Sequence, residues 1–119
     1  MKKFLLISLL NIILLNLIIS SPVLAAKQTE GSRIFAANCA VCHKAGGNVI
    51  VAYKTLKKDT LAKYLKGFNQ DAEAAVINQV THGKNAMPAF EGYLNQADIK
   101  AVAAYVVQQA KTGWYKSLD

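Results

Sequence analysis

The sequence predicts an all-α protein of about four helices. Apolar residues recur three and four positions apart in several stretches, the spacing that places them on one side of a helix. Residues that favour helix N-termini precede these stretches, and glycines follow them. Val49–Tyr53 is the one plausible strand, although a buried coil crossing a cofactor would have the same composition.

The first and last helices are predicted to pack on each other. The first runs from about Thr29, a residue able to cap it, to Cys42, and a glycine-rich link at 45–48 ends it. Its recurring side carries Ile34, Phe35 and Asn38. The last begins after Asn95, with Asp98 placed as in a capping box. Its apolar side carries Ile99, Val102, Ala103, Val106 and Ala110.

Two shorter helices are predicted between them. One begins at Asp59 and stops at Gly67, and the next begins near Asp71 and stops at Gly83. The residues expected to face inward are Leu61, Tyr64 and Leu65 in the former and Ala72, Ala75, Val76 and Val80 in the latter. The segment Lys84–Leu94 holds a proline and a glycine and is too short for a domain, so it is predicted to be a shaped loop.

Residues 1–25 are predicted to be a cleaved signal peptide. Two lysines form a positive start, the run Phe4–Ile19 is mostly apolar, and Val23-Leu24-Ala25 supplies small or apolar residues at the processing positions. An uncleaved membrane anchor is the alternative, because the run approaches the length that spans a bilayer. Cleavage after Ala25 leaves residues 26–119 as the mature domain, without stable membrane insertion.

The mature chain has 119 − 25 = 94 residues, the length of one small domain. A chain this short buries only about 60–65% of the surface that its unfolded state exposes, so a cofactor would supply missing core. Loss of two lysines lowers the formal net charge from +7 to +5, because all 7 acidic residues follow the cleavage site. This charge favours acidic partner surfaces. The lysines are dispersed without an aromatic or arginine-rich stripe, which argues against nucleic-acid binding, and we expect a monomer.

Both cysteines fall in Cys39-Ala40-Val41-Cys42-His43, the C-x-x-C-H pattern of covalent haem attachment. On one helical turn, the two thiols can each add across a haem vinyl group and form a thioether. The imidazole of the next residue can then ligate the iron. The pattern predicts one haem c per chain, attached through Cys39 and Cys42, with His43 as an axial ligand.

Other interpretations of the cysteine pair compete with haem attachment. A thioredoxin-like redox pair calls for a βαβ context, which the helical pattern does not supply. Half of a zinc site calls for a second pair of ligands, which is missing. A structural disulfide suits an oxidising compartment but does not require His43.

Met87 is predicted to be the second axial ligand. It lies in Ala86-Met87-Pro88-Ala89-Phe90, where small neighbours let the backbone approach a haem and Pro88 fixes the loop. The other candidate, His82, directly precedes Gly83 at a predicted helix end, where an imidazole suits the negative end of the helix dipole without a metal. Core filling is the alternative role for Met87.

With these residues in view, the chain resembles class I c-type cytochromes, and among them the cytochromes c6. The matching segments are Gly31 with Phe35, Asn38-Cys39-Ala40-Val41-Cys42-His43, Gly46-Gly47-Asn48, Lys54-Thr55-Leu56, Gln79-Val80, residues 83–90, residues 102–106 and Gly113-Trp114. The resemblance implies the class I cytochrome c fold, with about four helices wrapped around one covalently bound haem. It also implies Met87 as sixth ligand and Gln79 as an influence on the potential. Gly31, Phe35 and Tyr105 are implied to lie where the terminal helices cross.

The resemblance further implies a one-electron carrier in the thylakoid lumen. Such a carrier accepts an electron from cytochrome f of the cytochrome b6f complex and delivers it to photosystem I. The alternative is a periplasmic cytochrome that donates electrons to a respiratory oxidase. A haem enzyme would need an open iron position and a distal acid or base, which the surroundings of Met87 do not supply, so we expect no enzyme. Many algal relatives are acidic, whereas this chain is basic, and Trp114 is expected to be a C-terminal packing anchor.

Overall fold

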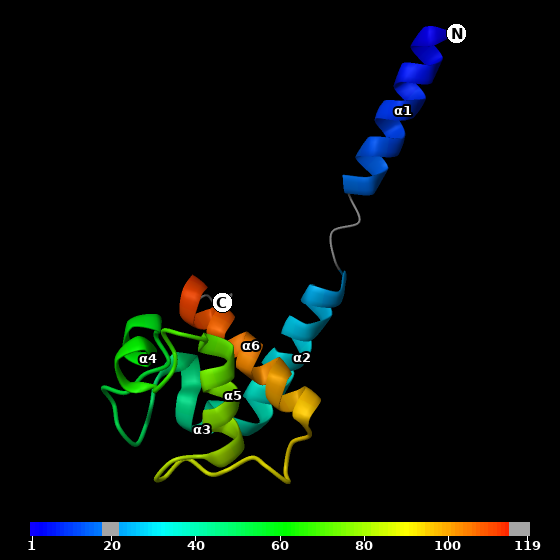
Figure 1. Cartoon of the computed structure of the whole chain (residues 1–119). Helices are drawn as coiled ribbons and strands as arrows, with labels where there is room; N and C mark the ends of the chain where they lie inside the picture. Colours follow the sequence, from blue (N-terminus) through cyan, green and yellow to red (C-terminus); the bar gives the residue numbers. More distant parts are fainter. Residues whose placement is uncertain (18–21, 115–119) are drawn as a thin grey trace.

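The computed structural model describes residues 1–17 and 22–114, with side chains described for residues 1–13 and 30–114. These residues form six α-helices and one short 3₁₀ turn, and no β-sheet occurs among them (Figure 1). The helices are α1 (Lys2–Leu17), α2 (Pro22–Asn38), α3 (Ala40–His43), α4 (Lys58–Tyr64), α5 (Ala72–His82) and α6 (Gln96–Thr112). The all-α prediction is confirmed, and the four predicted helices correspond to α2 with α3, α4, α5 and α6.

The packing of α2 on α6 organises the folded part of the chain. Gly31 makes the close approach possible, because a Cβ at this position would lie 2.2 Å from the backbone oxygen of Ala101 and 2.7 Å from Tyr105 Cβ. Phe35 then packs against Tyr105, with ring centroids 5.4 Å apart. The predicted contact between the terminal helices of the mature chain, with these residues at the crossing, is confirmed.

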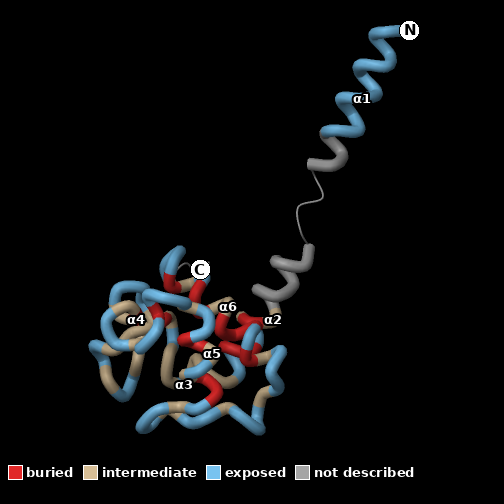
Figure 2. Tube along the Cα trace, viewed as in Figure 1, coloured by how far each residue is buried: buried red, intermediate tan, exposed pale blue. Residues whose placement is uncertain are grey.

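Helix α6 supplies the centre of the core. Its inward residues Ile99, Val102 and Ala103 are completely buried, and α5 packs against the same helix with Val76 and Val80. Figure 2 shows the buried residues gathered where α2, α5 and α6 meet. The predicted apolar sides of α5 and α6 are therefore confirmed.

The ends of α5 and α6 follow the sequence signals closely. The Asp71 side chain accepts a hydrogen bond from Ala74 N at 2.9 Å, and the Asn95 side chain accepts one from Asp98 N at 2.9 Å. These bonds satisfy backbone donors that the first helical turn leaves without partners. Gly83, with a φ of 66°, ends α5 in the left-handed region that glycine adopts at low cost.

Three local predictions are wrong. Helix α2 begins at Pro22 rather than at Thr29, because proline's fixed φ suits the first helical position and helix-compatible residues follow it without a break. Tyr64 is 42% exposed instead of inward, since its ring lies against Tyr53 on the surface with centroids 5.7 Å apart. The segment Val49–Tyr53 forms turns and bends rather than a strand, because the Asn48 side chain accepts hydrogen bonds from Ile50 N and Val51 N.

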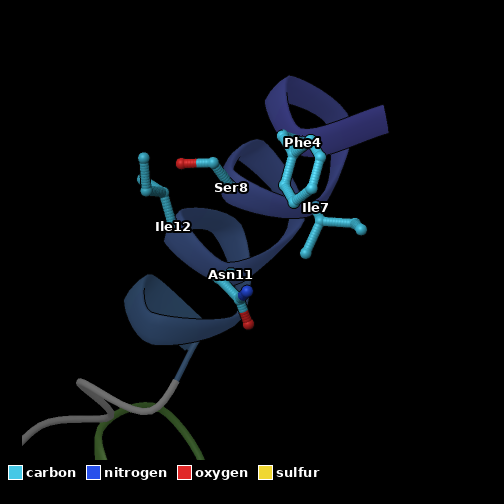
Figure 3. Close-up of a pocket in the computed structure, with 5 residues that line it drawn as sticks. All are labelled: Phe4, Ile7, Ser8, Asn11 and Ile12. Carbon is cyan, nitrogen blue, oxygen red and sulfur yellow. The ribbon is translucent and has the colours of Figure 1, made fainter. Parts of the chain in front are cut away.

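Helix α1 lies within the predicted signal peptide and exposes apolar side chains such as Phe4 and Leu5. Figure 3 shows Phe4, Ile7, Ser8, Asn11 and Ile12, which line a pocket on this single helix. No predicted site residue lines that pocket. Within residues 1–17 and 22–114, no helix combines the length and the apolarity that crossing a membrane requires. Cleavage after Ala25 remains a prediction.

Candidate functional site

The C-x-x-C-H motif occupies the junction between α2 and α3. Cys39 leaves the regular helix with a φ of −116°, yet its carbonyl oxygen still accepts hydrogen bonds from Cys42 N at 3.1 Å and from His43 N at 2.9 Å. This single turn keeps both cysteines and the histidine within one short, hydrogen-bonded segment. Both thiols are free and half-buried, so the pair does not form a disulfide in this structure.

The surroundings of Cys39 favour a neutral sulfur. Cys39 packs against the hydrophobic core, and burial raises the pKa of its thiol to about 11. A cysteine that binds zinc must be a thiolate, whereas the sulfur of a thioether carries no charge at any pH. The apolar setting therefore suits a thioether better than a metal-bound thiolate.

The orientation of His43 is set by the glycine-rich link. Its Nδ1 lies 2.9 Å from the carbonyl oxygen of Gly47. A carbonyl oxygen only accepts hydrogen bonds, so Nδ1 carries the proton and Nε2 keeps the lone pair that can ligate a metal. This arrangement of a ligating imidazole with its other nitrogen bound to a backbone oxygen is common at metal sites.

The link reaches this position through an unusual backbone path. The turn η1 (Lys44–Gly46) contains Ala45 and Gly46 with φ values of 52° and 73°. These left-handed residues reverse the chain after α3, so that the carbonyl of Gly47 returns to His43. The sequence predicted where the helix ends but missed Gly47 as the acceptor, and the glycine pair at 46–47 was the available signal.

Asn48 then shapes the loop that was predicted as a possible strand. Its Oδ1 accepts hydrogen bonds from Ile50 N at 3.0 Å and Val51 N at 2.8 Å, and its Nδ2 donates to the Lys54 carbonyl at 2.9 Å. Asparagine side chains stabilise turns in this way by replacing backbone partners. The three bonds hold residues 48–54 in a closed loop, which prevents the β-branched run from extending.

Met87 lies in a tight turn pressed against the end of α5. Lys84 and Met87 exchange two backbone hydrogen bonds of 3.0 Å each, and Asn85 between them has a φ of 54°. The turn crosses directly over Gly83, where an added Cβ would lie 2.5 Å from Met87 O and 2.6 Å from Ala89 N. The predicted shaped loop is confirmed, and Gly83 both ends the helix and leaves room for the loop.

The side chain of Met87 is half-buried against the core and has a polar neighbour. The amide Nε2 of Gln79 donates to Met87 Sδ, with the two atoms 3.8 Å apart. A thioether sulfur has two lone pairs, so a bond to this amide leaves one for a metal. The contact brings together two residues that the family resemblance had singled out.

His82 has a different environment. It is exposed, and its Nδ1 lies 3.0 Å from the carbonyl oxygen of Asn78 on the same helix. This contact holds the imidazole against its own helix at the C-terminal end of α5, which agrees with the helix-end position expected from the sequence. No group of three or more His, Cys, Asp or Glu side chains that could hold a metal ion occurs in the described part of the chain.

Comparisons with known proteins agree with these observations. Residues 26–106 match the family described as cytochrome C oxidase, cbb3-type, subunit III. A cytochrome c6 of Limnospira maxima is 64% identical over 84 residues, which cover 71% of this chain and 94% of that protein. A cytochrome c6 of a Nostoc species is 49% identical over 114 residues, which cover 96% and 99% of the two chains. The crystal structure of cytochrome c6 from the diatom Phaeodactylum tricornutum is similar with a TM-score of 0.70 and 52% identity, covering 73% of this chain and 98% of that one.

The chain belongs to the cytochrome c6 family. It is therefore an electron-transport protein of the class I cytochrome c fold, and its family membership implies a haem cofactor. The side chains fit that group. Two free thiols lie one turn apart, an imidazole has Nε2 available, and a thioether is held at the end of α5.

Proposed function

We propose that the mature chain carries one haem c bound covalently through Cys39 and Cys42, with His43 and Met87 as its axial ligands. When bound, this group supplies an iron that cycles between two oxidation states. We further propose that the protein shuttles single electrons in the thylakoid lumen, from cytochrome f of the cytochrome b6f complex to photosystem I.

The observation that carries the proposal is the pair of hydrogen bonds behind the two ligand side chains. Gly47 holds His43 in the tautomer that leaves Nε2 for a metal, and Gln79 contacts the sulfur of Met87. His82 also contacts a backbone carbonyl, that of Asn78, but its ring is exposed at the end of α5, whereas His43 is half-buried. Ligation by histidine and methionine raises the reduction potential relative to two histidines, which suits a carrier between a high-potential donor and its acceptor.

The Met87 turn also offers a surface for a short-lived encounter. Its small residues Ala86, Pro88 and Ala89 are exposed, and the exposed Lys84 lies beside them. A carrier must leave as readily as it arrives, which favours a small apolar contact guided by charge over a tightly packed interface. We propose that this patch contacts both redox partners in turn.

Haem attachment is tested by expressing the full chain in a host that exports proteins and attaches haem c, and by purifying the secreted product. We expect an intact mass equal to residues 26–119 plus one haem, and tryptic peptides in which Cys39 and Cys42 are both modified. A mass without haem would remove the basis of the proposal. A mass that includes residues 1–25 would instead leave the haem assignment intact and show that the leader is retained.

The role in photosynthesis is tested by flash oxidation of the reduced holoprotein with photosystem I particles. We expect fast, second-order oxidation after each flash. Rapid oxidation by a respiratory oxidase together with no reaction with photosystem I would assign the periplasmic alternative. Cytochrome b6f complex supplied with reduced quinol tests the other half of the cycle, where we expect reduction of the ferric protein.

A further inference from the structure

Trp114 is fixed to the loop that follows the haem motif, although it is 58 residues distant from its partner there. Its indole Nε1 donates to the carbonyl oxygen of Leu56 at 2.8 Å. Its ring packs on Phe35 and Tyr105, with centroids 5.0 and 6.0 Å apart. One polar bond and two aromatic contacts therefore hold this side chain.

The same ring lies on the backbone of Gly46. A Cβ at Gly46 would lie 2.2 Å from Trp114 Cγ and 2.4 Å from its Cδ1, so only a glycine allows this approach. The carbonyl of Gly46 accepts a hydrogen bond from Leu56 N at 2.7 Å. Leu56 thus uses its N–H on Gly46 and its carbonyl on Trp114, which joins the three residues in one closed contact.

Gly46 directly precedes the residue that orients the haem ligand. The Gly47 carbonyl accepts from His43 Nδ1 at 2.9 Å, and Gly47 N donates to Lys44 O at 3.0 Å. Ala45 and Gly46 both have positive φ, and a non-glycine residue in that region costs free energy that its surroundings must offset. The support from Trp114 is applied at the second of these two residues.

We propose that Trp114 is a positioning residue for His43. By holding Leu56 and Gly46, it keeps the Gly47 carbonyl on the Nδ1–H of the imidazole. The inference rests on the axial role of His43 put forward above. It gives the C-terminal tryptophan a part in setting the reduction potential, in addition to packing.

The sign of the change in reduction potential distinguishes loss of His43 positioning from a general loosening of the structure around the haem. A hydrogen bond from Nδ1–H to a carbonyl makes the imidazole a stronger donor at Nε2, which stabilises the more highly charged ferric state and lowers the potential. A weaker bond therefore raises the potential. General loosening would admit water to the haem, which favours the ferric state and lowers the potential.

Trp114→Phe is the sharpest variant, because it keeps an aromatic ring over Gly46 and removes the Nε1–H donor. In the reduced holoprotein, we expect the His43 Nδ1 proton to exchange with solvent about fivefold faster, the usual effect of losing one intramolecular hydrogen bond. We also expect a higher reduction potential and an unchanged methionine ligation band. Tyr105→Phe is the matched control, since it alters the same aromatic cluster without touching Leu56.

Equal proton exchange in the Trp114→Phe and Tyr105→Phe proteins would overturn the inference, and so would a lower potential in Trp114→Phe. A parent protein that lacks haem would instead refute the proposed function. The two failures are thus distinguishable.

A double-mutant cycle on stability tests the contact with Gly46 separately. Gly46→Ala should lower the stability of the parent holoprotein strongly, through backbone strain and collision with the indole. In a Trp114→Leu background, Gly46→Ala should lower the stability by less than it does in the parent, because the backbone strain remains but the collision with the indole is gone. Additive effects of the two changes would overturn the inferred contact.

Discussion

At the scale of single residues, the structure separates two side chains that the sequence could only rank. Met87 is half-buried and contacts Gln79, whereas His82 is exposed and contacts its own helix. A thioether sulfur packed against the core is placed to ligate a metal in the interior of the molecule. An imidazole at the exposed end of α5 serves the helix terminus.

Substitution of Met87 should change the ligation state of the holoprotein. In Met87→Ala, we expect loss of the iron-to-thioether charge-transfer band and a lower reduction potential, because the neutral sulfur that favours the ferrous state is gone. Absorption spectroscopy and redox titration measure both effects.

His82→Ala is the control for that experiment. We expect a spectrum and potential close to those of the parent, with at most a small loss of stability from the end of α5. Loss of the thioether band in His82→Ala, with its retention in Met87→Ala, would be the opposite pattern and would move the sixth ligand to His82.

At the scale of elements, the crossing of α2 and α6 determines how the haem motif is presented. Gly31 sits at the crossing, Phe35 lies one turn later, and the motif begins at Cys39, one further turn along. Cys39 N still donates to Phe35 O at 2.9 Å, so the motif continues directly from the packed helix. The part of α2 that packs on α6 therefore fixes the position of Cys39, the first residue of the motif.

Gly31→Ala tests this crossing. Alanine favours a helix over glycine by about 1 kcal/mol. Its Cβ would, however, lie 2.2 Å from the backbone oxygen of Ala101, and such overpacking costs about 1–3 kcal/mol or more. We expect the clash to win and the denaturant midpoint of the holoprotein to fall. Ser32→Ala, one position along, should shift the midpoint much less, and equal midpoints in all three proteins would contradict the close approach.

At the scale of the whole molecule, the core is small, and we expect its stability to depend on the haem. The completely buried residues of the described chain, Ile99, Val102 and Ala103, all lie on α6, while α4 contributes Leu61 as its buried residue. A domain of this size buries a limited share of its surface, and a bound group that contacts only the native state adds stability.

Removal of the attachment sites should abolish cooperative folding. In a Cys39→Ala/Cys42→Ala double variant, we expect weak near-ultraviolet circular dichroism from Trp114 and no sharp thermal transition. Val41→Ala is the matched control, because Val41 lies in the same motif but is 83% exposed and should leave attachment and melting unchanged. A sharp transition in the haem-free double variant would show that the side chains alone form a sufficient core.

The distribution of charge also belongs to this scale. The lysines are more clustered along the chain than predicted, since five of them lie in residues 54–66. Two of these, Lys54 and Lys63, place their ammonium groups 5.7 and 5.1 Å from the ring centre of Tyr64. The segment that follows α5, which carries Lys84, lies away from α4 (Figure 1). The contributions of Lys84 and of the lysines around α4 to partner attraction can therefore be tested separately.

Reaction with an acidic partner should slow as salt increases. The formal charge of +5 on residues 26–119 attracts such a partner, and the effect should fade as the Debye length falls from about 30 to about 10 Å. We expect Lys84→Gln to reduce the low-salt rate most among single lysine variants, because Lys84 adjoins the Met87 turn. Stopped-flow or flash kinetics against ionic strength measure this.

Lys100→Gln and Lys63→Gln are charge-matched controls on α6 and α4. A rate that falls equally in all three variants would mean that net charge alone acts, and the largest fall in Lys63→Gln would place the attraction at α4. A rate that rises with salt would show a basic partner surface, with the apolar patch governing the encounter.

Much of the site could be read from the sequence because its signals are local. The C-x-x-C-H motif, the capping residues Asp71 and Asn95 and the helix-ending Gly83 act on neighbours within a few residues, and the structure agrees with each helix end that they mark. Chain spacing alone fixes such short-range geometry. Errors arose where a local preference met a competing partner, as when Asn48 turned a β-branched run into a loop.

The sequence by itself determined the all-α class, the haem motif and the two candidate sixth ligands, since each depends on residue type and spacing. Only the tertiary structure decided how these parts support one another. Gly47 reaches His43 through a left-handed turn, Gln79 meets Met87 across a helix end, and Trp114 closes on Gly46 and Leu56. Contacts between distant segments depend on how whole helices pack, and no local pattern encodes them.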